Sequence, residues 1–361
     1  MEEINFIPEE YKKTIEECSI TWQSPSNIAL IKYWGKYGEQ MPKNPSISFT
    51  LDSCRTITEL KFIKKEQPSD TFDFEMYFGG VRNLGFEQKI TTFFQRIESY
   101  LPFLYEYKFE IHTTNTFPHS SGIASSASGM SALTLCLMSL ERSLSDMVMT
   151  DEYFNRKTSF LARLGSGSAC RSIEGDLVVW GEHQDIEGSN DLFGIKYPYE
   201  VHEVFKNFQD TILLVDKGEK QVSSTVGHKL MNDHPFAENR FQQAHQNLKD
   251  LKEILGTGNL TSFIDLVESE ALTLHSMMLT STPRFILMQP NTLEIIDRIW
   301  KFRKETKYPI CFTLDAGANV HVLYPKKDKE QILEFIKNEL IVYCQNGQYI
   351  CDQIGFGAKK M

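Results

Sequence analysis

A strand, a loop of small residues and a long apolar helix follow one another in the middle of the chain, and this succession limits the fold classes open to it. Phe109–Thr113 alternates between apolar and polar residues, as expected of a strand with one buried face. Pro118–Gly129 is rich in Ser, Gly and Ala, and the apolar, small-residue stretch Ala124–Leu144 predicts a buried helix. The sequence therefore predicts a mixed α+β fold.

Strand-like and helix-like segments are interleaved over the rest of the chain. Thr150 is a suitable N-cap for a helix that runs to Arg163, and apolar residues recur at steps of three and four from Ala237 to Leu255. A last helix is predicted at Lys329–Ile341. The predicted strands are Cys18–Gln23, Ser46–Leu51, Thr56–Ile63, Leu177–Trp180, Thr211–Val215, Pro309–Leu314 and Val320–Tyr324.

Length and composition are those of a globular protein with room for two domains. We expect residues 1–205 and 206–361 to form one domain each. The net charge of −10 argues against a broad nucleic-acid surface, although local amides and a few cations suffice for a small phosphorylated ligand. Seven cysteines without a C-x-x-C pair argue against a disulfide or zinc framework and favour a reducing cytoplasm. Neither a signal peptide nor an apolar run long enough to span a membrane is expected.

The segment Pro118–Gly129 has the features of a phosphate-binding loop. Small residues let the backbone approach a phosphate, and the N-terminus of the following helix offers unpaired N–H groups and the positive end of its dipole. Ser125 and Ser126 add hydroxyl groups. The segment matches neither G-x-x-x-x-G-K-[ST] nor G-x-G-x-x-G, and a helix start chosen for close packing explains the same residues. Both interpretations stay open at this point.

Three further segments carry side chains suited to catalysis or ligand binding. Arg171 stands in the Ser/Gly-rich segment Gly165–Ser172, where it is either a bidentate anion ligand or a solvated arginine in a flexible turn. Lys32 follows an apolar run and precedes two aromatic residues, so it is either a partly desolvated cation in a cleft or an edge lysine that reaches water. Asp315 ends an apolar strand before a small-residue turn, where a general base, a metal ligand and an ordinary hairpin residue are the alternatives.

Taken together and in this order, the segments resemble the diphosphomevalonate decarboxylase family, a branch of the GHMP kinase superfamily. The likeness extends over nearly the whole chain. It implies an N-terminal α+β domain similar to ribosomal protein S5 domain 2, a ferredoxin-like C-terminal domain, and an active site in the cleft between them. The matching blocks are Pro25–Ala29, Lys32–Lys36, Pro45–Leu51, Asn115–Ala127, Gly165–Ser172, Val222–Thr225 and Asp315–Asn319.

The resemblance also implies an activity, the ATP-dependent decarboxylation of (R)-5-diphosphomevalonate to isopentenyl diphosphate in the mevalonate pathway of isoprenoid biosynthesis. The 3-hydroxyl group would be phosphorylated on the way, with Asp315 as general base, Lys32 stabilising charge beside it, and Arg171 binding the substrate carboxylate. The other substrate-binding residues implied by the match are Tyr33, Trp34, Gly35, Lys36, Ser166, Gly167, Ser168, Ala169, Cys170 and Thr225. The residues implied for the ATP phosphates are Pro118, Ser121, Gly122, Ala124, Ser125, Ser126 and Ser223.

Further implications are Mg²⁺ on the ATP phosphates without a dedicated protein cage, a cytoplasmic homodimer, and no nucleic-acid or membrane partner. The sequence departs from the family at His119–Ser121 and at Ala318. Gln88 or Lys89 stands where the family places an arginine that grips the substrate's diphosphate, and Arg82 lies nearby. Two sister activities therefore stay open: decarboxylation of 5-phosphomevalonate to isopentenyl phosphate, and phosphorylation of mevalonate by a 3-kinase. A ligand-binding relative without catalysis is the alternative from another class.

Overall fold

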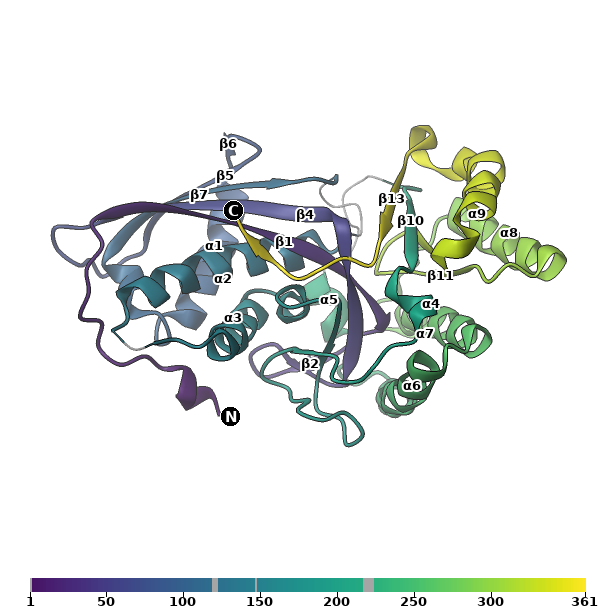
Figure 1. The fold of residues 1–361 in the computed structure, drawn as a ribbon, viewed down its shortest axis with the longest axis horizontal. Coiled ribbons are helices and arrows are strands. Elements are labelled where there is room, and N and C mark those ends of the chain that lie inside the picture. Colours follow the sequence, from purple (N-terminus) through teal and green to yellow (C-terminus); the bar gives the residue numbers. More distant parts are fainter. Residues whose placement is uncertain (1, 119–122, 147, 217–223) are drawn as a thin grey trace.

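Two larger β-sheets organise the chain, one in each half (Figure 1). The computed structural model describes residues 2–118, 123–146, 148–216 and 224–361. The first sheet has eight strands in the order β14-β1-β4-β7-β5-β6, and β8 pairs with β4 and β9 with β8. Its strands are β1 (Glu17–Ile31), β4 (Ser46–Lys64), β5 (Asp73–Phe78), β6 (Val81–Arg82), β7 (Tyr107–Asn115), β8 (Leu177–Trp180), β9 (Ile195–Lys196) and β14 (Lys359–Lys360).

Three helices cover one face of this sheet: α1 (Leu84–Ile97), α2 (Ser125–Leu144) and α3 (Asp151–Gly165) (Figure 1). The side chains of β4 explain why helices pack on only one face of the sheet. Leu60 and Phe62 are buried in the core to which α2 contributes Leu137, whereas Lys61 and Ile63 are exposed on the opposite face. Such alternation is typical of an antiparallel strand with one face in the core and the other in water.

The second half contains a four-stranded sheet in the order β11-β12-β10-β13. Its strands are β10 (Gln209–Leu213), β11 (Cys311–Thr313), β12 (Val320–Tyr324) and β13 (Tyr349–Gln353). The helices of this half are α4 (Glu203–Lys206), α5 (Ser224–Lys229), α6 (Ala237–Thr257), α7 (Leu260–Thr280), α8 (Pro290–Thr306) and α9 (Lys329–Phe335). Leu248 and Leu251 of α6 share an apolar core with Leu30 of β1 and Phe49 of β4. This common core joins the two halves and holds the walls of the cleft between them.

Several elements have the predicted position. The bounds of β8 and β12 agree with the prediction, and α6 spans the predicted apolar stripe. Thr150 caps α3, since its side chain accepts the N–H of Tyr153 at 3.2 Å. Helix α2 begins at Ser125, one residue after the predicted start. The sequence interpretation did not identify α1, α7, α8, β5 or β13.

One pair of predicted strands is wrong, and one predicted helix changes its type along its length. The strands predicted at Ser46–Leu51 and Thr56–Ile63 are one strand, because β4 continues through the polar residues between them. Asp352 of β13 accepts the backbone N–H groups of Asp52 and Ser53 at 2.9 and 2.8 Å, which satisfies amides that lie outside the ladder. The helix predicted at Lys329–Ile341 is present, but only α9 is α-helical: the chain continues as a π turn at Ile336–Leu340 and a 3-10 turn at Ile341–Tyr343.

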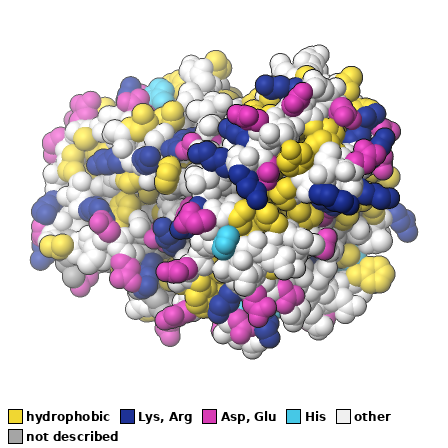
Figure 2. All heavy atoms as spheres, turned by 45° about the vertical axis from the view of Figure 1, so that its right-hand side comes forward, with side chains coloured by type: hydrophobic (Ala, Val, Ile, Leu, Met, Phe, Trp, Pro, Cys, Tyr) yellow, Lys and Arg dark blue, Asp and Glu magenta, His cyan; other side chains and the backbone are white. Residues whose placement is uncertain are grey.

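The end of the chain returns to the first half, because β14 pairs with β1 at Trp22 and Gln23. The predicted domain boundary falls within α4 and stays a prediction. No helix in the described ranges is long and apolar enough to cross a membrane. Lys and Arg side chains are interspersed with Asp and Glu over the face shown in Figure 2.

Candidate active site

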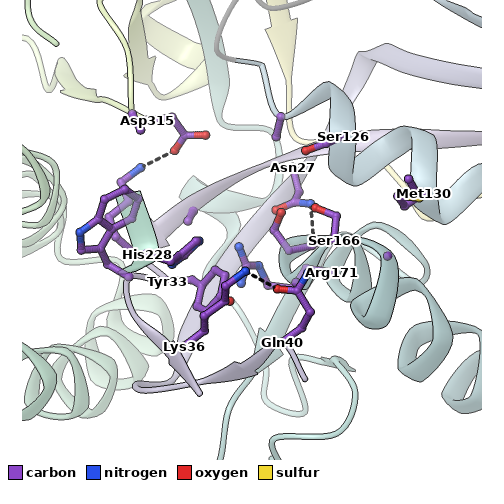
Figure 3. A pocket seen from close by; sticks show the side chains of 18 of the residues that line it. Asn27, Tyr33, Lys36, Gln40, Ser126, Met130, Ser166, Arg171, His228 and Asp315 are labelled. Carbon is purple, nitrogen blue, oxygen red and sulfur yellow. Dashed lines mark hydrogen bonds and ion pairs between the residues drawn. The ribbon is translucent and has the colours of Figure 1, made fainter. Parts of the chain in front are cut away.

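A pocket of about 430 Å³ brings together residues from both halves of the chain (Figure 3). Its walls come from the segment after β1, from α1 and α2, from the short helix η3 (Gly167–Ser172), from α5 and from the turn after β11. Of the predicted site residues, those that line it are Lys32, Tyr33, Trp34, Lys36, Ala124, Ser126, Ser166, Gly167, Ser168, Arg171 and Asp315. Residues separated by up to 283 positions in the sequence therefore meet in one cavity.

Lys32 and Asp315 form an ion pair in the wall of the pocket. The Nζ atom of Lys32 lies 3.1 Å from Oδ1 of Asp315, and the two side chains are 2% and 27% exposed. Burial lowers the pKa of Lys32 below its ordinary value, and the negative charge of Asp315 opposes that shift. A buried ammonium beside a partly exposed carboxylate suits a site where a proton is removed and negative charge develops nearby.

Buried polar groups hold the backbone of this pair. Glu270 of α7 accepts the N–H of Lys32 at 2.9 Å, and Nη1 of Arg240 in α6 donates to Glu270 at 2.9 Å. Arg240 and Glu270 are both almost completely buried. The ring of His275, also on α7, donates its Nε2 hydrogen to the carbonyl oxygen of Asp315 at 3.1 Å. Both reacting groups are thus oriented by the rigid helices α6 and α7.

Arg171 is a buried cation on η3, at the base of the pocket. Its Nε and Nη1 atoms donate to the hydroxyl groups of Ser48 and Ser46 on β4, both at 2.6 Å. No acidic side chain among the described residues forms an ion pair with it. The neutral serine partners orient the guanidinium and leave its charge available for an anion in the pocket. The predicted alternative of a solvated arginine in a flexible turn is wrong.

Residues Ser166–Ser168 form the wall beside Arg171. A Cβ atom on Gly167 would lie 2.9 Å from the hydroxyl oxygen of Tyr33, so only glycine allows this approach. Ala169 and Cys170 are buried behind the wall and do not line the pocket. Burial raises the pKa of the Cys170 thiol to about 12, which keeps it protonated and makes it unsuited to act as a nucleophile. Gly35 likewise lies outside the lining, with φ +95°.

The N-terminus of α2 separates this pocket from a second one. Ala124 precedes the helix in a left-handed conformation, and among the described residues no side-chain hydrogen bond caps the helix. Ser126 lines both pockets, and Ser125 lines the second. Apolar side chains, among them Phe78 and Phe86, make up much of the second pocket. The open N–H groups of α2 therefore lie where an anion would bridge a polar and an apolar pocket.

Some predicted phosphate- and substrate-binding residues are not part of either lining. Pro118 is partly buried and lines neither pocket. Ser121, Gly122 and Ser223 lie outside the described residues, as do His119 and Ser120. The backbone of Thr225 belongs to α5. Within the described residues, no group of three or more His, Cys, Asp or Glu side chains is placed to hold a metal ion.

Cations line the α1 end of the pocket, and one of them, Arg96, was not identified from the sequence. Lys89, Thr92 and Arg96 occupy one face of α1 and reach the cavity, and Nη1 of Arg96 donates to a backbone carbonyl at 2.8 Å. Burial lowers the pKa of the half-buried Lys36, and the charges of Arg96 and Lys229 lower it further. Positions 89, 92 and 96 are three and four residues apart, which places them on one face of a helix, and this pattern could have identified them from the sequence.

Two residues considered from the sequence do not lie in this group. Arg82 is on the exposed strand β6, where it bonds to Glu75 and Glu87 at 3.0 and 2.9 Å. Gln88 does not line the pocket, whereas its neighbour Lys89 does. A histidine of α5, His228, also lines the pocket and was not identified from the sequence.

Comparisons with known proteins agree with this geometry. Two family descriptions match consecutive parts of the chain: the diphosphomevalonate decarboxylase-like N-terminal domain at residues 24–191 and the mevalonate 5-diphosphate decarboxylase C-terminal domain at residues 211–355. The diphosphomevalonate decarboxylase of Debaryomyces hansenii is 28% identical over 329 residues, covering 87% of this chain and 81% of that protein.

Solved structures extend the likeness to three dimensions. The crystal structure of mevalonate diphosphate decarboxylase from Staphylococcus aureus matches with a TM-score of 0.80 and 28% identity, over 96% of this chain and 98% of that one. A structure described as "MDDEF in complex with MVAPP, AMPPCP and Magnesium" matches with a TM-score of 0.80 and 26% identity, over 96% and 99% of the two chains. Matches of this extent confirm the predicted α+β fold of the GHMP kinase type.

Proposed function

This chain belongs to the diphosphomevalonate decarboxylase family, and we propose that it converts 5-diphosphomevalonate and ATP to isopentenyl diphosphate, ADP, phosphate and carbon dioxide. The observation that carries the proposal is the pair of Lys32 and Asp315, 3.1 Å apart, in a pocket bounded by the N-terminus of α2 and by Arg171. This arrangement puts a base, a phosphate-binding helix end and a carboxylate ligand around one cavity.

The first step is phosphorylation of the tertiary 3-hydroxyl group. Asp315 accepts the hydroxyl proton, the oxygen attacks the γ-phosphorus atom of ATP, and the bond from that phosphorus to ADP breaks. Lys32 stabilises the negative charge that builds up on the transferred group, and in its buried position that interaction is stronger than in water. The phosphorylated oxygen is then a good leaving group.

The second step couples loss of phosphate to loss of carbon dioxide. The bond between C3 and its oxygen breaks, the carboxyl group leaves C2, and the electron pair of that bond forms the new double bond between C2 and C3. Arg171 suits the carboxylate because its guanidinium is oriented by Ser46 and Ser48 and forms no ion pair with a described acidic side chain. By holding the carboxylate in line with the departing phosphate, it favours elimination.

The nucleotide fits the two adjoining cavities. The uncapped N-terminus of α2, with Ala124, Ser125 and Ser126, suits the phosphates, and the apolar second pocket suits an adenine ring. Mg²⁺ carried on the ATP phosphates would neutralise charge that develops during transfer. A relative whose structure holds AMPPCP and magnesium supports this assignment.

The cations at the α1 end favour a 5-diphosphate over a 5-monophosphate. Lys36, Lys89 and Arg96 line that end of the pocket, away from the Lys32–Asp315 pair, and a second phosphate adds charge for them to bind. Arg96 thus compensates for the absence of an arginine at position 88 or 89. The remaining substrate-binding residues that we propose are Tyr33, Trp34, Ser166, Gly167, Ser168 and Thr225. A homodimeric, cytoplasmic enzyme is part of the same proposal.

The test is to incubate the purified chain with ATP, Mg²⁺ and, separately, mevalonate, its 5-phosphate and its 5-diphosphate. We expect carbon dioxide and phosphate from the 5-diphosphate, with kcat/KM about tenfold or more above that for the 5-phosphate, because one lost charge-assisted contact costs at least that much. Higher efficiency with the 5-phosphate would select the sister decarboxylase. Phosphorylated mevalonate without carbon dioxide would select the 3-kinase.

A further inference from the structure

His228 is a buried histidine that the mechanism above does not use. It lies on α5, is 8% exposed, and lines the pocket beside Tyr33 (Figure 3). No motif in the sequence drew attention to it. A buried side chain that still borders a ligand cavity is either packing for the wall or a contact for the ligand.

The hydrogen bonding of the ring determines its tautomer. The backbone N–H of Gly35 donates to Nδ1 of His228 at 3.1 Å, so Nδ1 acts as the acceptor. In the neutral ring the hydrogen is then on Nε2. Burial lowers the pKa of His228 to about 3, and the positive charges of Lys36 and Arg171 add to that shift. The ring is therefore a neutral donor throughout the physiological range.

Packing holds this donor in one orientation. The ring centroid of His228 lies 4.2 Å from that of Tyr33 and 4.9 Å from that of Trp34. Next to it, a Cβ atom on Gly227 would come within 2.4 Å of the Trp34 ring, so α5 is tightly seated on this aromatic residue. Preorganised donors of this kind lose little conformational entropy when a ligand binds.

The Nε2 hydrogen has no protein acceptor in the part of the chain that the structure describes. A donor that lines the pocket and has no protein acceptor is available to a ligand oxygen there. The charged groups that act on the ring are the cations Lys36 and Arg171, which favour an anionic ligand. In Figure 3 the side chains of His228 and Lys36 lie on the same side of the pocket, and Lys36 belongs to the end that we assign to the phosphates.

We propose that His228 is a substrate-binding residue that donates its Nε2 hydrogen to a phosphoryl oxygen of the 5-diphosphate group. The proposal rests on the function proposed above. The alternative is that His228 only supports Gly35 by accepting its N–H. The two roles use different ring nitrogens, so two amide substitutions separate them.

In His228→Asn, the side-chain oxygen takes the place of Nδ1 and still accepts from Gly35, but no donor reaches the position of Nε2. In His228→Gln, the amide nitrogen reaches the Nε2 position. Binding of 5-diphosphomevalonate is measured by isothermal titration calorimetry without ATP, and turnover by release of carbon dioxide. We expect the Kd to rise about 10- to 100-fold in His228→Asn and to stay within about threefold in His228→Gln, as for loss or retention of one hydrogen bond to a charged group.

Melting temperatures of both variants control for misfolding. If substrate affinity is unchanged in His228→Asn and reduced in His228→Gln, His228 serves only to accept the N–H of Gly35. If both variants bind the substrate equally weakly and melt at a lower temperature, His228 has a packing role. Either result overturns the inference while leaving the proposed function standing. Wild-type protein that binds the 5-diphosphate but releases no carbon dioxide would overturn the function and leave the binding role of His228 to be judged by the same titrations. Wild-type protein that does not bind it overturns both.

Discussion

Replacing Asp315 by asparagine removes the proton acceptor with little change in shape. The side-chain oxygen of asparagine still accepts a hydrogen bond from Lys32, whose Nζ lies 3.1 Å from Oδ1 in the present structure. At that separation, two unit charges attract by about 5 kcal/mol at an effective dielectric constant of about 20. Much of this attraction offsets the cost of burying the Lys32 ammonium, so we expect Asp315→Asn to lose no more than about 3 kcal/mol of folding free energy.

The effect on turnover is larger than the effect on folding. A positioned general base contributes about 10²- to 10⁴-fold, so the activation free energy should rise by about 3–5 kcal/mol and kcat should fall accordingly. ATP affinity should stay within about threefold, because Asp315 lies apart from the N-terminus of α2, and a threefold change is under 1 kcal/mol. The assay follows ADP in a single turnover, with ATP binding measured separately.

Lys32→Met is the matched partner of this variant, since it removes the cation and leaves the carboxylate. We expect it to lower kcat by about 10²- to 10³-fold, the usual loss when one electrostatic contact to the transition state is removed. Because the two groups act as a unit, the double variant should lose much less than the product of the single losses. A kcat for Asp315→Asn within tenfold of wild type would exclude Asp315 as the base.

Three further predictions concern the surroundings of the pair. Arg96→Gln should raise KM for the 5-diphosphate by about tenfold and leave KM for ATP unchanged in steady-state kinetics, whereas Arg82→Gln, on an exposed strand, should change neither. Glu270→Gln leaves the buried Arg240 without its anion, so urea denaturation should show a loss of about 3–5 kcal/mol, and an unchanged midpoint would refute the supporting role. Burial lowers the pKa of His275 to about 4, so the folded protein binds fewer protons than the unfolded chain below pH 6.5. The unfolding free energy of wild type should therefore fall by about 1.4 kcal/mol more per pH unit than that of His275→Gln between pH 6.5 and 4, and parallel curves would contradict this.

Much of the fold follows from local patterns, and the failures have tertiary causes. A strand was predicted at Cys18–Gln23, before Pro25, yet β1 continues through the proline to Ile31. A register shift against β4 between Pro25 and Asn27 accommodates the proline. β4 continues through Asp52, whose backbone N–H donates a hydrogen bond to a carboxylate of β13 300 residues away. Neither compensation can be deduced from a short window of sequence.

Some residues of the candidate site could likewise be predicted from the sequence, and others could not. Lys32, Arg171 and Asp315 stand in distinctive segments, so a family resemblance was enough to select them. Arg96 and His228 stand in segments without a distinctive pattern, and only the packing of α1 and α5 brings them to the pocket. Cys170 belongs to a distinctive segment but is turned into the core, where its small size serves packing. Membership of a motif therefore indicates proximity to the site, while contact with the cavity depends on the orientation of each side chain.

The most direct test of the proposed chemistry is the ratio of carbon dioxide released to ADP formed, measured with 5-diphosphomevalonate labelled at the carboxyl carbon. Coupled phosphorylation and elimination predict one carbon dioxide and one phosphate for each ADP, and neither product when ATP is omitted. ADP formed without carbon dioxide, or carbon dioxide released without ATP, would contradict the account.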